Sequence, residues 1–140
     1  MHNLVALVTL ASLLLFYYMM FLVGRARMKL GVSAPAVTGH PEFERCFRVQ
    51  ANTLEGLIVF LPSLWLCAIA LDRSCGGALG DELSAGLGVL WIIGRIIYMR
   101  SYIRDPASRS LGFGVQFVAT AILLVSALIS AIWGLSQGVL

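Results

Sequence analysis

The stretch "PEFERCFRVQANTLEGLIVFLP", residues 41–62, begins with charged side chains and ends in an apolar sequence. Gln50, Asn52 and Glu55 lie inside the part that is otherwise apolar. Polar groups inside a long hydrophobic segment are costly unless they meet a partner, water or a ligand. The stretch therefore predicts a hydrophobic helix with a polar face that has something to bind.

The composition indicates a membrane protein. Of the 140 residues, 59% are hydrophobic and only 12% are charged, and the mean hydropathy is +0.90. A soluble domain of this size needs more charge on its surface. Four apolar segments are each close to the ~20 residues that cross a bilayer as a helix. We therefore expect an all-α integral membrane protein, a single domain over residues 1–140, with helices over about 4–23, 45–71, 83–104 and 111–135.

The charges predict an orientation. Basic residues gather between the first two expected helices and around the end of the third, whereas acidic residues dominate the connection between the second and third. The positive-inside rule then places both basic regions in the cytoplasm and both termini outside it. The arginines form no stripe on a soluble domain, so nucleic acid is not an expected partner. No cysteine or histidine pair has metal-ligand spacing, so no metal site is expected.

The second expected helix carries a polar stripe. Arg48, Asn52 and Glu55 are spaced i, i+4 and i+7, and Arg45 lies one turn earlier. Residues at this spacing share one face of a helix. Gln50 points elsewhere. The stripe therefore runs from the cytoplasmic end into the membrane.

The third expected helix repeats this arrangement. Trp91, Arg95, Tyr98 and Tyr102 also fall on one face. Arg95 lies roughly two turns from the helix end, where a lone charge costs ~2.5 kcal/mol or more, so it needs a partner or water. Pro106 then disfavours helix at the preceding residue and turns the chain.

Two polar stripes that open toward the same face predict a shared cavity. Guanidiniums, a carboxylate, an amide and phenols suit a small zwitterionic or anionic ligand. The alternative is that these groups only join helices, with Glu55 and Arg95 as a structural ion pair. Arg100 and Arg104 are expected to be anchors whose charged ends reach the membrane surface.

Residues 43–55 closely resemble the signature of a known membrane family. They carry the pattern F-E-R-x-x-R-x-Q-x-N-x-x-E at Phe43, Glu44, Arg45, Arg48, Gln50, Asn52 and Glu55. The later "GRIIYMRSYIRDPASR", residues 94–109, resembles the third-helix segment of the same family. The family is that of membrane-associated proteins in eicosanoid and glutathione metabolism (MAPEG), and the match is to the subgroup that holds microsomal glutathione transferases and leukotriene-C synthase.

The resemblance implies a left-handed four-helix bundle that assembles as a homotrimer. Glutathione, as co-substrate, would lie between neighbouring subunits near the cytoplasmic face. The resemblance implies that Arg109 is the catalytic residue, which holds the glutathione sulfur as a thiolate. It also implies a set of glutathione-binding residues: Arg27, Arg48, Gln50, Asn52, Glu55, Tyr98 and Tyr102.

Two positions depart from the family pattern. Gly56 stands where the animal enzymes usually have tyrosine, and Met28 stands where the leukotriene synthase has a second arginine. We therefore expect a glutathione transferase that conjugates apolar electrophiles and also reduces lipid hydroperoxides, rather than a leukotriene synthase. The alternatives are a non-catalytic lipid-binding or scaffold membrane protein of the same fold and a small transporter.

Overall fold

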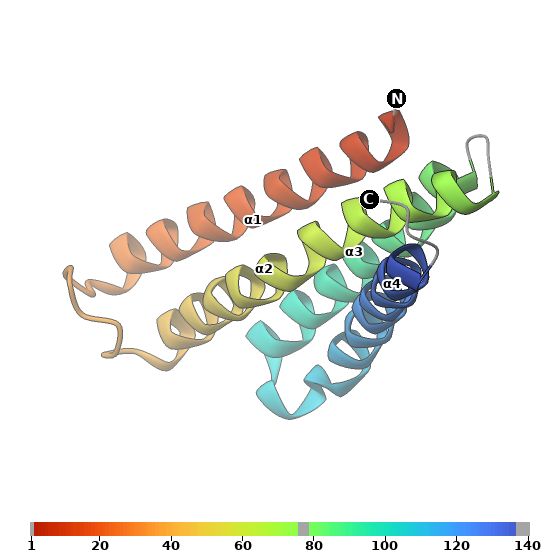
Figure 1. Cartoon of the computed structure of the whole chain (residues 1–140). Coiled ribbons are helices and arrows are strands. Elements are labelled where there is room, and N and C mark those ends of the chain that lie inside the picture. The colour runs from red at the N-terminus through yellow and green to blue at the C-terminus, as the bar shows by residue number, and fades with distance from the viewer. Residues whose placement is uncertain (1, 76–78, 137–140) are drawn as a thin grey trace.

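The computed structural model describes residues 2–75 and 79–136 and is helical throughout this part apart from the connections (Figure 1). The elements are α1 (Asn3–Leu30), α2 (Pro41–Cys75), α3 (Leu79–Arg104), the short 3-10 helix η1 (Pro106–Arg109) and α4 (Ser110–Ser136). Within these described residues, four helices are long and apolar enough to cross a membrane. The expected fold class, an all-α membrane protein with four spanning helices, is confirmed.

The first helix is longer than its apolar sequence predicts. It continues to Leu30 through the basic residues, instead of ending near residue 23. Gly31 then ends it in the left-handed region (φ 66°), and the N–H of this residue donates to the carbonyl of Arg27. An apolar segment indicates where a helix crosses lipid, whereas the end of the helix is set by its capping residue.

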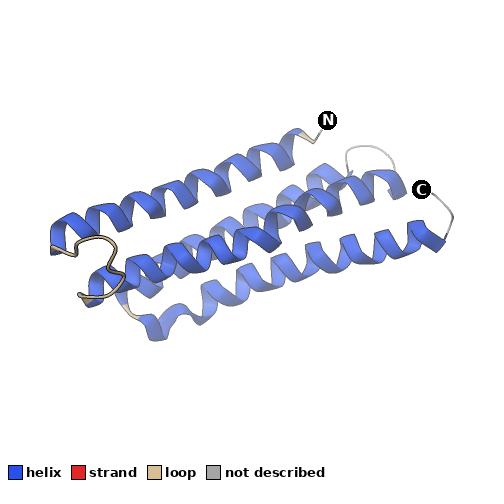
Figure 2. Ribbon diagram, turned by 60° about the vertical axis from the view of Figure 1, so that its left-hand side comes forward, coloured by secondary structure: helices blue, strands red, loops and turns tan. Residues whose placement is uncertain are grey.

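The four long helices run side by side along one axis (Figures 1 and 2). In both views α1 begins and α4 ends at one end of the bundle, and the α1–α2 connection and η1 lie at the other. α1 and α4 each pack against both α2 and α3. α2 and α3 also pack against each other, so the two polar stripes lie on helices in direct contact. The side of the membrane that each end faces stays a prediction from the charges.

Aromatic stacking holds the middle of the bundle. The rings of Phe60 in α2 and Trp91 in α3 are parallel, with centroids 4.2 Å apart and an interplanar angle of 5°, and both are buried. Leu64, Leu123 and Val5 extend this core toward α4 and α1. This packing fixes the two stripe-bearing helices relative to each other.

Small residues bring α3 and α4 into close contact. A Cβ on Gly112 of α4 would collide with the main chain of Tyr98, and one on Gly94 of α3 would lie 2.8 Å from the main-chain nitrogen of Gln116. Small residues allow membrane helices to approach this closely. The position of Tyr98 therefore depends on the absence of a side chain on α4.

At the end of the bundle where α1 begins, a buried carboxylate connects two helices. Asp81, in the first turn of α3, accepts hydrogen bonds of 3.0 Å from the main-chain nitrogens of Leu4 and Val5. These are free donors in the first turn of α1, and a carboxylate is favourable at a helix N-terminus. Asp81 thus ties the start of α1 to the start of α3.

Candidate functional site

The polar stripes of α2 and α3 meet at one hydrogen bond. The side-chain amide of Asn52 donates to the hydroxyl of Tyr98 over 2.9 Å. Tyr98 is buried, and Asn52 is half-buried. The bond leaves the amide oxygen of Asn52 and the hydroxyl hydrogen of Tyr98 free for a ligand.

Two further groups extend this contact toward the end of the bundle. The rings of Tyr98 and Tyr102 lie 5.5 Å apart, and the guanidinium carbon of Arg109 lies 5.7 Å from the centre of the Tyr102 ring. Asn52, Tyr98, Tyr102 and Arg109 are called the polar cluster below. They come from α2, α3 and η1, although residues 52 and 109 are far apart in sequence.

The turn after α3 places Arg109. Asp105 is extended (φ −151°, ψ 112°), as expected for a residue before proline, and its carboxylate accepts from the main-chain nitrogen of Ala107. Pro106 starts η1, which ends at Arg109. The guanidinium is therefore placed at the η1 end of the bundle, and the side chain is exposed.

Arg95 is a buried charge within the bundle, only 3% exposed. Its Nη2 donates to the main-chain oxygen of Asn52 over 3.2 Å, and its guanidinium carbon lies 5.0 Å from the ring centre of Tyr98 and 5.4 Å from that of Trp91. Its Nε and Nη1 have no hydrogen-bond partner in the described part of the chain. The buried guanidinium of Arg95 therefore has a hydrogen-bond partner for only one of its three nitrogens within the described residues.

Gly56 provides the space that Arg95 occupies. A Cβ at Gly56 would lie 2.7 Å from Nη2 of Arg95 and 3.7 Å from the indole of Trp91. The guanidinium therefore covers the helix surface from which a tyrosine would project in the family pattern. A side chain at position 56 and the present position of the Arg95 guanidinium therefore exclude each other.

A cavity of about 260 Å³ opens beside Arg95, between α2, α3 and α4. Glu55 and Asn52 line it from α2, and Gln116 and Thr120 line it from α4. Gln116 is buried, and its side-chain oxygen has no hydrogen-bond partner among the described residues. The sequence reasoning missed Gln116 and Thr120. Their i, i+4 spacing within an apolar segment was the signal available.

Arg48 and Glu55, the two charged members of the α2 stripe, are exposed on the single chain. None of the ion pairs among the described residues includes Glu55 or Arg95, so the structural pair considered as an alternative does not form here. Both groups are therefore available to a ligand or a neighbouring subunit.

Arg27 and Gln50 are not brought to the polar cluster of their own chain. Nη1 of Arg27 donates to the carbonyls of Val32 (3.1 Å) and Ala36 (2.9 Å), and its guanidinium lies 4.6 Å from the ring centre of Phe43. Arg27 thus holds the α1–α2 connection. Gln50 lies within α2 and is half-buried, and none of the contacts that build the polar cluster involves its side chain.

Comparisons with known proteins agree with this architecture. The model of the MAPEG family matches residues 5–129. An uncharacterized protein of Synechocystis is 43% identical over 132 residues, which cover 94% of this chain and 90% of the relative. Human microsomal glutathione S-transferase 2 is 36% identical over 120 residues (86% and 76%). Bovine leukotriene C4 synthase is 35% identical over 106 residues (76% and 65%).

Proposed function

The chain belongs to the MAPEG family, and on this premise we propose that it is a membrane glutathione transferase. The family and its similarity to a microsomal glutathione S-transferase support a glutathione-related membrane enzyme. The observation that carries the finer proposal is the polar cluster, which joins an amide, two phenols and a guanidinium from α2, α3 and η1.

The proposed binding site matches the charges of glutathione, a tripeptide with two carboxylates, one ammonium group and one thiol. Arg48 binds a carboxylate, since a guanidinium offers two parallel donors. Glu55 binds the ammonium group. Asn52, Tyr98 and Tyr102 add hydrogen bonds from the groups that their mutual contacts leave free.

Arg109 is proposed to activate the thiol. A guanidinium beside the sulfur favours the charged form and lowers the pKa of the thiol. The thiolate then forms a bond to the electrophilic carbon of an apolar substrate, and the leaving group departs with the electron pair of the bond that breaks. The apolar substrate reaches the sulfur from the bilayer.

The same thiolate supports reduction of a lipid hydroperoxide. It attacks the terminal peroxide oxygen, the O–O bond breaks, and the released alkoxide takes a proton to become an alcohol. A second glutathione then displaces the hydroxyl group from the sulfenic acid, which gives the disulfide and water. Two thiols supply the two electrons, so the protein needs no redox group.

We propose a homotrimer in which Arg27 and Gln50 reach the glutathione of a neighbouring subunit. In one chain Arg27 lies against the α1–α2 connection, while Arg48 and Glu55 are exposed. A second chain that covers the exposed side chains of Arg48 and Glu55 would bring its own Arg27 and Gln50 to the glutathione bound there. Crosslinking of the purified protein in detergent should then give trimers, and the presence of monomers alone would contradict this assembly.

The test is glutathione binding by calorimetry on protein in detergent, together with turnover of an aryl halide. Saturable binding and conjugation are expected. S-methylglutathione is the matched ligand, since it keeps both carboxylates and the ammonium group but cannot form a thiolate. Binding of glutathione without turnover would favour the non-catalytic alternative. Absence of binding would contradict the proposed function.

A further inference from the structure

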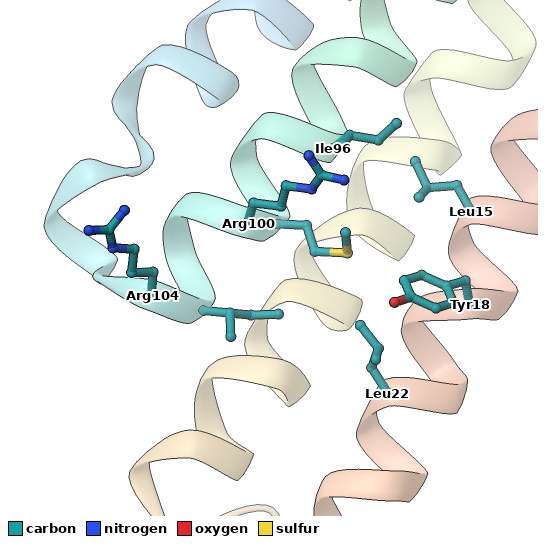
Figure 3. A pocket seen from close by; sticks show the side chains of 8 residues that line it. Leu15, Tyr18, Leu22, Ile96, Arg100 and Arg104 are labelled. Carbon is teal, nitrogen blue, oxygen red and sulfur yellow. The ribbon is translucent and has the colours of Figure 1, made fainter.

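A second hollow lies between α1 and α3 and shares no lining residue with the cavity beside Arg95. Its volume is about 570 Å³. Most of its wall is apolar and comes from both helices, including Leu15 and Leu22 of α1 and Ile96 and Met99 of α3. Figure 3 shows these two helices facing each other across it. We call it the α1–α3 groove.

Polar groups occur at one part of this apolar groove. Arg100, Arg104 and the phenol of Tyr18 also line it. Figure 3 shows the guanidinium of Arg100 on the side that faces α1, whereas Arg104 extends away from α1. The hydroxyl of Tyr18 points into the space between the helices. A cation and a hydrogen-bond donor are therefore presented across the groove from opposite helices.

The direction of Arg100 is not explained by snorkelling. A snorkelling arginine would reach toward the helix end, at Arg104, where the membrane surface lies. Figure 3 instead shows its guanidinium beside Ile96, one turn further from that end. No ion pair includes Arg100 in the part of the chain that the structure describes, so its charge has no acidic partner there. A guanidinium so placed favours an anion in the groove.

We propose that the α1–α3 groove binds an anionic phospholipid of the surrounding membrane. The phosphate accepts hydrogen bonds from Arg100 and from the Tyr18 hydroxyl, and an acyl chain lies along Leu15, Leu22 and Ile96. Charge complementarity selects the headgroup, since guanidiniums bind phosphates through two donors. The apolar wall selects an amphiphile over a soluble anion, and basic pockets between membrane helices suit acidic headgroups. This inference does not rest on the glutathione reaction.

The test compares two lipids with identical acyl chains, one with an anionic headgroup and one with a zwitterionic headgroup. The full chain is purified in an uncharged detergent and mixed with equal amounts of phosphatidylglycerol and phosphatidylcholine that carry identical acyl chains. Native mass spectrometry then counts the molecules of each lipid that stay bound. The wild type should retain phosphatidylglycerol preferentially, and Arg100→Gln should weaken this retention by about fivefold, the effect of one basic residue near an acidic headgroup.

The matched control is Arg25→Gln. Arg25 is an exposed arginine on α1 outside the groove, so its loss should leave the preference intact. Equal retention of both lipids by the wild type, or equal effects of the two arginine variants, would overturn the proposal.

A second pair of variants tests the apolar part and serves if Arg100→Gln does not fold. Ile96→Trp fills the groove and should abolish the preferential retention of phosphatidylglycerol. Ile93→Trp, at an exposed position of α3 outside the groove, should leave this retention unchanged. If Ile96→Trp changes the mass of the oligomer and leaves lipid retention unchanged, a second copy of the chain covers the groove and the proposal is wrong.

Discussion

The guanidinium of Arg95 lies against Gly56, so that a Cβ at this glycine would be 2.7 Å from Nη2. The same Nη2 donates to the main-chain oxygen of Asn52, whose side chain binds Tyr98. Gly56 therefore decides where a buried cation sits relative to the polar cluster. The absence of a side chain on α2 thus allows a guanidinium of α3 to lie against the helix.

Replacement of Gly56 by alanine should move the Arg95 guanidinium. The neighbour is the far end of a flexible side chain, so the helix stays intact while the 3.2 Å bond to Asn52 is lost, at a cost of about 1 kcal/mol. Gly86→Ala is the control, since Gly86 is a helical glycine with open space around it. Unfolding in detergent, followed by circular dichroism, should show Gly56→Ala less stable than Gly86→Ala. Equal stabilities would contradict the contact.

The Asn52–Tyr98 bond predicts a binding defect. Tyr98→Phe removes the hydroxyl and leaves the ring, so glutathione affinity should fall by about 1–2 kcal/mol with little loss of helical content. Tyr17→Phe is the control, because Tyr17 is 70% exposed on α1. Calorimetry on both variants measures the difference. An unchanged affinity for Tyr98→Phe would remove this phenol from the binding site.

The approach of α3 to α4 predicts a packing defect at one glycine and none at its neighbour. Gly112→Ala would push a methyl group into the main chain of Tyr98 and should lower the free energy of unfolding by about 1–3 kcal/mol. Gly114→Ala meets open space and should be neutral or slightly stabilising. Thermal unfolding of the two variants compares them directly, and similar midpoints would show that the helices are not packed this closely.

The hydrogen bonds of Asp81 to the start of α1 predict that this carboxylate stabilises the bundle, whereas the neighbouring Glu82 does not. Asp81→Asn replaces one of the two carboxylate acceptors by an NH₂ group that faces a main-chain N–H, which should cost about 1–2 kcal/mol. Glu82→Gln, at an exposed neighbour, should be nearly neutral. Thermal unfolding midpoints of the two variants test this difference. An unchanged midpoint for Asp81→Asn would contradict the capping role of Asp81.

The helices and the central contact of the site could be predicted because each depends on local spacing. Apolar segments of bilayer length indicate membrane helices, and the i, i+4 and i+7 positions put Asn52 and Tyr98 on the polar faces of theirs. The direction of Arg27 could not be predicted, because it follows from a connection whose carbonyls accept its hydrogen bonds. Gln116 and Gly112 were missed because periodicity does not tell which face of α4 meets α3.

The last prediction separates activation of glutathione from its binding. The guanidinium carbon of Arg109 lies 5.7 Å from the ring centre of Tyr102, at the end of η1, and the side chain is exposed. If it stabilises the thiolate, Arg109→Ala should raise the pKa of bound glutathione's thiol. Thiolate absorbance in the ultraviolet at neutral pH should then fall, together with turnover.

Affinity should change less than turnover, because in the proposed site the carboxylates and the ammonium group of glutathione would still meet Arg48, Asn52 and Glu55. Arg104→Ala is the control. Arg104 is equally basic and close in sequence, but its guanidinium lies outside the polar cluster, and its main-chain carbonyl accepts a hydrogen bond from Arg45. This variant should keep the thiolate signal. If the two variants behave alike, or if Arg109→Ala keeps full absorbance and turnover, the activating group is another member of the cluster, and Tyr98 and Tyr102, whose hydroxyls can donate to sulfur, become the candidates.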